Sequence, residues 1–446
     1  MEKALGKSTS EMVNANAAGI DVGAHELWVC VPAGRAEPSV RVFSTFTPDL
    51  YQLAAWLKAC GVTTVAMEST GVYWVPLFEM LEAHNFQVYL VNARHLKNVP
   101  GRKSDVLDCQ WIQKLHSLGL LSASFRPEAE MCQLRAYLRH RAALLQHRAP
   151  HILQMQKALL LMNLQLPQVL TDITGMTGLA IVRAIVAGER DPLQLAQLRQ
   201  SSCHASQDVI AKALTGDWKE EYLFILQQSL ALFDFYTAQV AACDKEIQRH
   251  FATMKPATVS QPSILPSPSK STSKNAPLPT TRLDLVRIVG VDLVAVPGLS
   301  ASLAQTILSE IGTDMSKWPS AKHFASWLGL APHNDISGGK VLHSRTLPTR
   351  NRAGQAFRQA AATLTRSQSV FGAFYRRKRA FLGPQQALLA TAHKLARTVY
   401  HMLKDHQPYQ EIGAKTYDAQ QRQRDLVLLQ KKAAKLGLVL ALPDPT

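Results

Sequence analysis

Four acidic residues in the first quarter of the chain have types and spacing that suit metal-dependent chemistry. Asp21 is the only charged residue in the apolar run 18–23, and a charge in a core strand is costly unless it is paired or binds a metal. Glu68 ends another apolar run, while Asp105 and Asp108 are three residues apart and share one face of a helix. Together they predict an all-oxygen site for Mg²⁺, with Mn²⁺ as a substitute, which would polarise a phosphodiester.

Each acid also has a simpler interpretation. Asp21 and Glu68 can be strand residues whose side chains reach solvent, and Asp105 and Asp108 can be stabilising charges at a helix N-terminus. Taken singly, these interpretations are favoured. The metal site is favoured when the four acids are considered together with the order of the elements that carry them.

The elements that must position these acids follow from the hydrophobic pattern. Short apolar runs predict strands and helical spacing predicts helices, in the order β-β-β-α-β-α-β, which is typical of a mixed sheet covered by helices. The predicted strands are 18–22, 27–31, 40–46, 64–67 and 87–91, and the predicted helices are 49–60, 75–84 and 104–118. This pattern places acids within the first strand, at the end of the fourth, and at the start of the last helix.

The middle of the chain is almost wholly helical in its pattern. Two long arms predict a coiled-coil hairpin, and Pro150 is expected to kink or break the first arm. The apolar stripe of the first arm consists of Leu134, Leu138, Leu144, Leu145, Ile152, Met155 and Leu159. The stripe of the returning arm consists of Tyr222, Ile225, Leu230, Leu232, Phe235, Val240 and Ile247.

The predicted fold class is α/β plus all-α. Residues 256–281 contain six prolines among Ser, Thr and Lys, which is typical of a flexible linker. The predicted organisation is an α/β domain at 1–125, a helical coiled-coil region at 126–255, the linker, a mainly helical domain at 282–410 and a basic tail at 411–446.

The composition favours a nucleic-acid partner. Lys and Arg total 49 against 33 Asp and Glu, a formal net charge of +16, and such an excess attracts phosphate polyanions. Basic residues on predicted helices, at Arg135, Arg139, Arg141, Arg148 and 376–379, are therefore interpreted as nucleic-acid contacts rather than solvated faces. The six cysteines form no C-x-x-C pair, which argues against a zinc site and a disulfide framework. No segment resembles a signal peptide or a membrane span.

Two turns near the C-terminus are candidates for phosphate chemistry. In Ser337-Gly338-Gly339-Lys340 the glycines allow close backbone approach and a serine alkoxide can attack phosphorus, although a polar turn is the default interpretation. The basic residues that follow can clamp phosphates or form a solvated loop: Lys340, His343, Arg345, Arg350 and Arg352. The Pro-Gly turn at 296–299, before a predicted helix at 301–311, can bind phosphate or be a plain turn.

These motifs resemble a family of insertion-sequence recombinases that are guided by a bridge RNA. Their N-terminal DEDD domain has the ribonuclease-H-like fold of Holliday-junction resolvases, and their C-terminal transposase domain carries a serine. Asp21, Glu68, Asp105 and Asp108 match the DEDD motif, and Ser337 matches the catalytic serine. Three further stretches match: Glu68-Ser69-Thr70-Gly71-Val72-Tyr73-Trp74, 101–108, and Asp172-Ile173-Thr174-Gly175 with Gly188-Glu189-Arg190-Asp191-Pro192. The chain departs from the family at Ser300, where a second glycine is usual, and in the length of its linker.

The resemblance implies a transposase that excises and inserts its own mobile element in the bacterial cytoplasm, at the nucleoid. A noncoding bridge RNA would pair with the element ends and the target DNA, and the protein would read backbone shape. The four acids would bind Mg²⁺ at the scissile phosphate, and Ser337 would form a phosphoserine-linked DNA intermediate within a homodimer or homotetramer whose active sites combine two subunits. The implied nucleic-acid contacts are Arg102, Lys103, Gly338, Gly339, Lys340, Arg345, Arg350 and Arg352.

Two alternatives remain open at this point. A metal-dependent, structure-specific endonuclease of the resolvase type would use water as its nucleophile and would need the acids but not Ser337. A catalytically dead nucleic-acid-binding scaffold would need neither, and the presence of all four acids counts against it.

Overall fold

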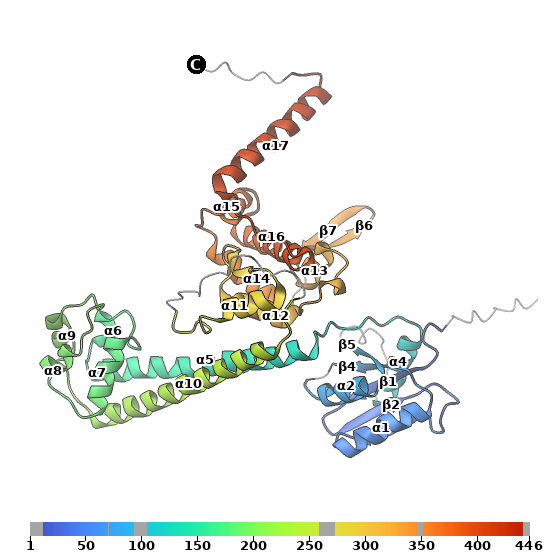
Figure 1. Cartoon of the computed structure of the whole chain (residues 1–446), viewed down its shortest axis with the longest axis horizontal. Coiled ribbons are helices and arrows are strands. Elements are labelled where there is room, and N and C mark those ends of the chain that lie inside the picture. The colour runs from blue at the N-terminus through green and yellow to red at the C-terminus, as the bar shows by residue number, and fades with distance from the viewer. Residues whose placement is uncertain (1–11, 70, 93–104, 258–272, 347–350, 440–446) are drawn as a thin grey trace, which may run out of the picture. The chain divides into compact units, whose positions relative to one another are not determined.

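The computed structural model describes residues 12–69, 71–92, 105–257, 273–346 and 351–439 (Figure 1). The chain divides into two compact units, Met1–Arg126 and Pro127–Thr446. Within the described ranges, none of the helices combines the length and apolarity that crossing a lipid bilayer requires. The predicted fold class, α/β plus all-α, is confirmed by a mixed sheet in the first unit and a mainly helical second unit.

The first unit is built on a five-stranded sheet in the order β3-β2-β1-β4-β5. The pairs β1–β2 and β2–β3 are antiparallel, whereas β1–β4 and β4–β5 are parallel. The strands are β1 (Ala17–Val22), β2 (Glu26–Cys30), β3 (Val40–Ser44), β4 (Thr64–Glu68) and β5 (Gln87–Val91). The helices are α1 (Thr47–Ala59), α2 (Trp74–Ala83) and α4 (Asp105–Ser117). The predicted element order is confirmed, and the predicted strand ends differ by at most two residues.

The two faces of this sheet pack against different helices. Side chains alternate along a strand, and Ile20 and Met67 belong to the core formed with α1 and α2. Ala66 and Val91 instead contact Ile112 of α4. Residues 19 and 21 of β1 therefore face α4 rather than α1 and α2.

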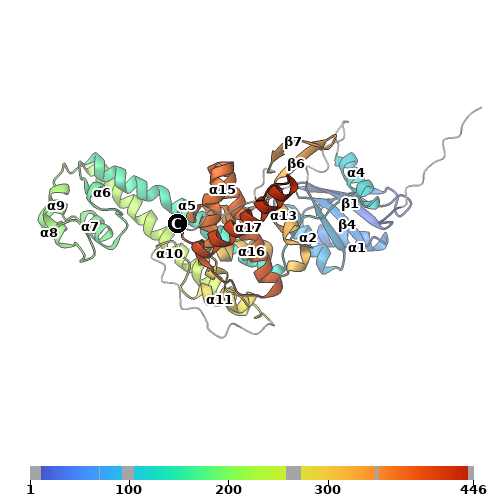
Figure 2. The same cartoon turned by 90° about the horizontal axis from the view of Figure 1, so that it is seen from above.

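The second unit begins with a helical hairpin. α5 (Ala129–Leu161) and α10 (Glu220–Thr253) run side by side in both views (Figures 1 and 2). Four short helices join them and share a buried core with the hairpin end: α6 (Leu166–Val169), α7 (Met176–Val186), α8 (Pro192–Gln197) and α9 (Gln207–Ala213).

Pro150 does not break the first arm, so the break that was expected as one of two outcomes does not occur. α5 continues through Pro150 as one helix of 33 residues. A proline removes one backbone hydrogen bond and displaces one carbonyl. Pro150 lies on the exposed side, where water can satisfy the freed carbonyl, while α10 packs along most of the helix.

The stripe predicted for the returning arm was partly wrong. Ile225, Leu232 and Phe235 are 43%, 42% and 55% exposed. The side chains that α10 buries are Leu223, Leu226, Ser229, Leu230, Phe233, Val240, Cys243, Ile247 and Phe251. Apolar residues occur on more than one face of this helix, so the pattern alone selected the wrong ones.

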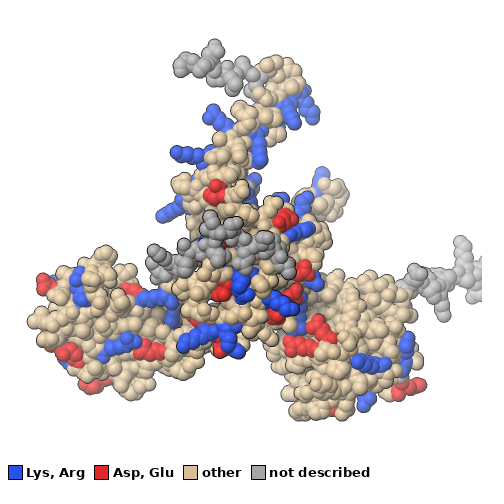
Figure 3. All heavy atoms as spheres, viewed as in Figure 1, with Lys and Arg blue, Asp and Glu red and all other residues tan. Residues whose placement is uncertain are grey.

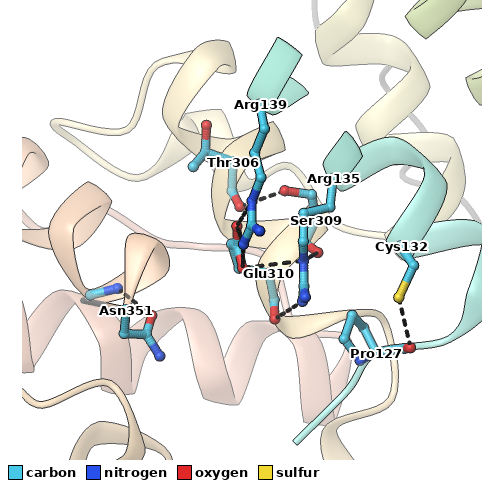
Figure 4. A network of polar contacts seen from close by, with 9 residues as sticks. Pro127, Cys132, Arg135, Arg139, Thr306, Ser309, Glu310 and Asn351 are labelled. Carbon is cyan, nitrogen blue, oxygen red and sulfur yellow. Dashed lines mark hydrogen bonds and ion pairs between the residues drawn. The ribbon is translucent and has the colours of Figure 1, made fainter. Parts of the chain in front are cut away.

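The arginines of α5 mainly bind other parts of the protein, which corrects their interpretation as nucleic-acid contacts. Arg139 Nη2 lies 2.8 Å from Glu310 Oε1, and Arg135 donates to the backbone oxygens of Ser309 and Glu310 (Figure 4). Glu310 is 9% exposed, and removing one partner of such a buried pair leaves an uncompensated charge. These contacts attach α5 to α12 (Ala301–Ile311).

Arg141 and Arg148 are buried between α5, α10 and residues before α11. Arg141 pairs with Asp244 at 2.6 Å and donates to the backbone oxygens of Asn275 and Ala276. Arg148 donates to Thr237 Oγ1 at 3.2 Å. Part of the segment 256–281 therefore packs on the helical hairpin.

In the rest of the second unit, the described residues form helices and one β-hairpin, which the sequence pattern did not predict. The hairpin consists of β6 (His333–Ser337) and β7 (Lys340–Arg345). The remaining helices are α11 (Thr281–Val289), η1 (Leu293–Ala295), η2 (Met315–Lys317), α13 (Ala321–Trp327), α14 (Arg352–Thr363), α15 (Val370–Leu382), α16 (Pro384–Asp405) and α17 (Gly413–Lys435). Tyr400 of α16 is 1% exposed, and its hydroxyl donates to Trp318 O at 2.8 Å.

Candidate active site

The parallel pair β1–β4 brings two of the predicted acids to one edge of the sheet. Ile20 is the register partner of Met67, so Asp21 and Glu68 follow at adjacent carboxyl ends. In-register neighbours on parallel strands point to the same face, which here is the face covered by α4. Sheet pairing alone therefore places these two carboxylates side by side.

Gly19 allows α4 to approach this edge closely. A Cβ atom at Gly19 would overlap the backbone of Cys109 and Gln113, with Gln113 Cα only 2.8 Å away. Gln113 Nε2 also donates to Ala17 O at 3.2 Å. Glycine inside a strand often marks such a backbone approach. The sequence analysis did not single out Gly19, although a glycine two residues before a strand carboxylate was an available signal.

The close approach of α4 gives Asp21 three acidic neighbours. The pKa of Asp21 is raised to about 6, first by burial and then by the negative charges of Glu68, Asp108 and Asp105. The other three predicted acids are therefore all within electrostatic reach of Asp21. Like charges that gather in a partly buried site disfavour ionisation, and a bound cation relieves this cost.

The four acids are not close enough together to form a complete set of metal ligands. Among the described residues, no group of three or more Asp, Glu, His or Cys side chains is close enough to hold a metal ion. Asp105 is exposed, whereas Asp21, Glu68 and Asp108 are half-buried. The donor set consists of carboxylate oxygens, which are the ligands that Mg²⁺ prefers. The chemistry of the group fits a hard divalent cation, with coordination requiring the side chains to move closer together.

A buried histidine holds the other end of α4 against the sheet. Thr64 Oγ1 donates its hydrogen to Gln87 O at 3.0 Å, so the 2.8 Å contact with His116 Nε2 has the histidine as donor. His116 is 1% exposed, and its Nδ1 atom has no hydrogen-bond partner. Burial lowers the pKa of His116 to about 4, because a proton on Nδ1 would add an unpaired buried donor.

Lowering the pH from 7 to 5 is expected to destabilise the first unit through His116. Its pKa is below the ordinary value near 6.5, so the unfolded chain binds more protons in this window and stability falls as the pH falls. The contribution of His116 to this loss is about 2 kcal/mol at pH 5. The raised pKa of Asp21 acts in the opposite direction over the same pH range, so the His116 contribution is taken as the difference between wild type and His116→Phe. Hydrogen exchange of the β4 amides at both pH values would measure it. The loss should be much smaller in His116→Phe and unchanged in His25→Asn, an exposed control; an equal loss in His116→Phe would contradict the assignment.

Ser337 lies at the tip of the β6–β7 hairpin in the second unit. It is the register partner of Lys340, and Gly338 and Gly339 form the two-residue turn with φ of 56° and 76°. Two successive positive φ values characterise a type I′ turn, which glycine adopts without strain. Ser337 is exposed, so its side chain is accessible to solvent.

Most of the described basic residues that closely follow Ser337 lie on the exposed strand β7. Lys340, His343 and Arg345 lie on β7, all of whose residues are exposed, and Arg352 is exposed at the start of α14. Arg102, Lys103 and Arg350 lie outside the described residues. The structure therefore groups Ser337 with several predicted phosphate contacts, whereas the four acids belong to the other unit.

The Pro-Gly turn before α12 has a structural role. A Cβ atom at Gly298 would lie 2.8 Å from Ala360 O of α14, so glycine permits this packing. Ser300 caps α12 by accepting a hydrogen bond from Leu303 N at 3.3 Å, which uses one of the free N–H groups at the helix start. These contacts favour the plain-turn interpretation.

Comparison with known families decides the class of protein. Residues 18–163 match a family described as a transposase, of the DEDD type of IS110 elements, and residues 292–376 match the transposase IS116/IS110/IS902 family. The chain carries both domains of an IS110 family transposase. The first match contains the four acids around Asp21, and the second contains Ser337. No curated protein matches the chain.

The matches assign a DNA transposase activity to this chain, and DNA is therefore its partner. The first match, whose family is named for a DEDD motif, includes the acids that the sheet and α4 gather. This class of domain uses a divalent metal. In this transposase the four acids therefore lie in the first matched segment, and the hairpin serine lies in the second.

Proposed function

We propose that this transposase is a bridge-RNA-guided recombinase in which the four acids hold Mg²⁺ and Ser337 is the nucleophile. The observation that supports the metal site is Asp21, whose pKa is raised to about 6 by burial and by three neighbouring acids. An ionised cluster of this kind is unfavourable without a cation. The protein would act in the bacterial cytoplasm, at the nucleoid.

The proposed reaction conserves the energy of the phosphodiester. The Ser337 hydroxyl loses its proton, its Oγ atom forms a bond to phosphorus, and the bond from phosphorus to one deoxyribose oxygen breaks. The departing oxygen takes up a proton, so no net proton is consumed. Attack by the hydroxyl of a second DNA end reverses these changes and frees the serine.

Asp21 and Glu68, at the sheet edge, would hold the metal together with Asp105 and Asp108 of α4. When bound, Mg²⁺ supplies Lewis acidity to the scissile phosphate and charge neutralisation. The protein's own contribution would be positional, because β1, β4 and α4 bring the four carboxylates to one edge of the sheet, from which they would close on the ion. Lys340 and Arg345 would bind the phosphates that flank the serine.

The proposed enzyme is a homodimer or homotetramer. The β6–β7 hairpin exposes Ile336, Val341 and Leu342 at 63%, 54% and 61%, which is unusual for a hairpin that functions alone. A serine on such an exposed element can reach the acidic site of another copy. The net charge of +16 and the resemblance to guided recombinases support an RNA partner that pairs with element ends and target.

Covalent trapping tests the serine mechanism. The transposase is incubated with Mg²⁺, element-end DNA and the adjoining noncoding RNA, then denatured and separated by electrophoresis. Wild type and Ser201→Ala, an exposed serine of the same unit that does not line the basic groove described below, are expected to form a DNA adduct. Ser337→Ala and Asp21→Ala are expected to form none, and omission of the RNA should remove the adduct from wild type.

The second candidate function is a resolvase-type endonuclease with water as the nucleophile. The observation that favours it is that Ser337 and the four acids belong to different units. DNA cleavage by Ser337→Ala at the wild-type rate, without an adduct in either protein, would establish this candidate and exclude the serine mechanism.

A further inference from the structure

A basic groove lies in the second unit, between β7 and the helices α14 to α17. It encloses about 1300 Å³, more than the roughly 300–1,000 Å³ of most small-molecule sites. Its lining includes seven cations from β7 and from α14 to α17, namely Arg345, Arg358, Arg377, Lys378, Lys394, Arg397 and Arg424. No carboxylate is among the described lining residues. Such a recess suits an extended anion better than a small neutral ligand.

The cations of the groove divide into fixed and available groups. Arg377 is fixed by Asp425 at 2.8 Å and by Gln421 at 2.9 Å. Arg397 and Arg424 are exposed, and neither has a hydrogen bond or ion pair within the described part of the chain. These two guanidinium groups can therefore bind phosphate without first losing a protein partner.

Lys394 shows how strongly positive charge is concentrated here. Its Nζ atom lies 4.6 Å from the centre of the Phe374 ring and 4.4 Å from that of Tyr417. Burial and the charge of Arg424 lower the pKa of Lys394 to about 8. Figure 3 shows Lys and Arg side chains continuing along α17, beyond the groove. A polyanion in the groove would neutralise this excess charge.

We propose that this groove binds the phosphodiester backbone of a single nucleic-acid strand and leads that strand toward the β6–β7 hairpin. The groove includes Ser344 and Arg345 of β7, the strand that leaves the Ser337 turn. Grooves that follow one strand combine recessed cations with little sequence preference. The proposal rests on the nucleic-acid chemistry of the proposed function, but it requires neither the metal nor the serine.

Strand binding by groove variants tests this inference. Arg397→Gln/Arg424→Gln removes the two available cations. Lys415→Gln/Arg422→Gln removes the same charge from exposed positions that do not line the groove. Binding of full-length protein to labelled oligothymidylate, to an RNA oligonucleotide of equal length and to duplex DNA is measured in EDTA, where strand cleavage cannot contribute.

The groove variant is expected to bind at least one single strand roughly tenfold more weakly. The slope of log affinity against log salt should become shallower by about 1.4, or about 0.7 for each lost contact. The control should change binding less than twofold, and both variants should keep the wild-type melting temperature. If the variant weakens binding of the DNA oligonucleotide, the groove binds a DNA strand. If it weakens binding of the RNA oligonucleotide, the groove binds an RNA strand.

Three results would overturn the inference: unchanged binding of both single strands, an equal loss in the control variant, or a loss confined to duplex DNA. Because these measurements need no covalent adduct, failure of the serine mechanism in the trapping experiment would leave them interpretable. A positive groove result with a negative trapping result would retain the strand site and discard the serine nucleophile.

Discussion

Asp21→Asn is expected to stabilise the first unit at pH 8 while removing DNA cleavage. Burial and three acidic neighbours raise the pKa of Asp21 from 3.8 to about 6. The folded state therefore binds more protons than the unfolded state between these values, and ionisation of Asp21 costs stability above pH 6. Asparagine cannot ionise, and the expected gain is about 1–2 kcal/mol after allowance for partial solvent exposure. Ionised Asp21 destabilises the fold, and a residue with this effect is typically required for activity.

The loss of cleavage by Asp21→Asn should exceed the roughly 10–100-fold that loss of an outer-shell metal partner costs. Urea unfolding in EDTA measures the stability gain, and cleavage of element-end DNA measures the activity. Adding Mg²⁺ should raise the melting temperature of wild type but not of the variant. Glu26→Gln, an exposed acid on the adjacent strand β2, should match wild type in all three measurements. Cleavage by Asp21→Asn at the wild-type rate would refute the metal site.

Gly19→Ala is expected to separate α4 from the sheet edge and to inactivate the transposase. The added Cβ atom would overlap the backbone of Cys109 and Gln113, and backbone cannot turn aside as a flexible side chain does. Overpacking of this kind lowers the free energy of unfolding by about 3 kcal/mol. The shift would also move Asp105 and Asp108 away from Asp21, so cleavage should fall with stability.

Gly34→Ala provides the matched control. No atom lies within 4 Å of a Cβ atom at Gly34, but its φ is +80°, so that variant meets backbone strain without a steric clash. The free energy of unfolding of Gly34→Ala should fall by about 1 kcal/mol, and this variant should still cleave DNA. Urea unfolding and the cleavage assay compare the two variants. If Gly19→Ala were as stable and as active as Gly34→Ala, close approach of α4 would not be what positions the acids.

The sequence determined the architecture of the first unit and the identity of its acids. Alternating apolar residues and regular turn signals are local properties, so they predicted each strand and the order of elements around Asp21 and Glu68. The isolated carboxylate in an apolar strand was visible for the same reason. The sequence also predicted a turn at Ser337, because paired glycines favour one.

Other features depended on contacts between residues far apart in the chain. The β6–β7 hairpin is exposed on both faces, so it lacks the alternation that marks a half-buried strand. Ile225 and Phe235 looked like core residues, because a helix with several apolar faces does not reveal which one meets α5. Arg139 looked available until its partner Glu310, 171 residues away, was in place.

The close approach of α4 to the acids, and the groove, were decided by the tertiary structure. Gly19 matters only because the backbone of α4 lies against it, and the pKa of Asp21 depends on acids from two other elements, β4 and α4. The groove collects cations from β7 and helices α14 to α17. Sequence pattern reports what each segment prefers by itself, whereas charge density and close approach arise only when packing brings separate segments together.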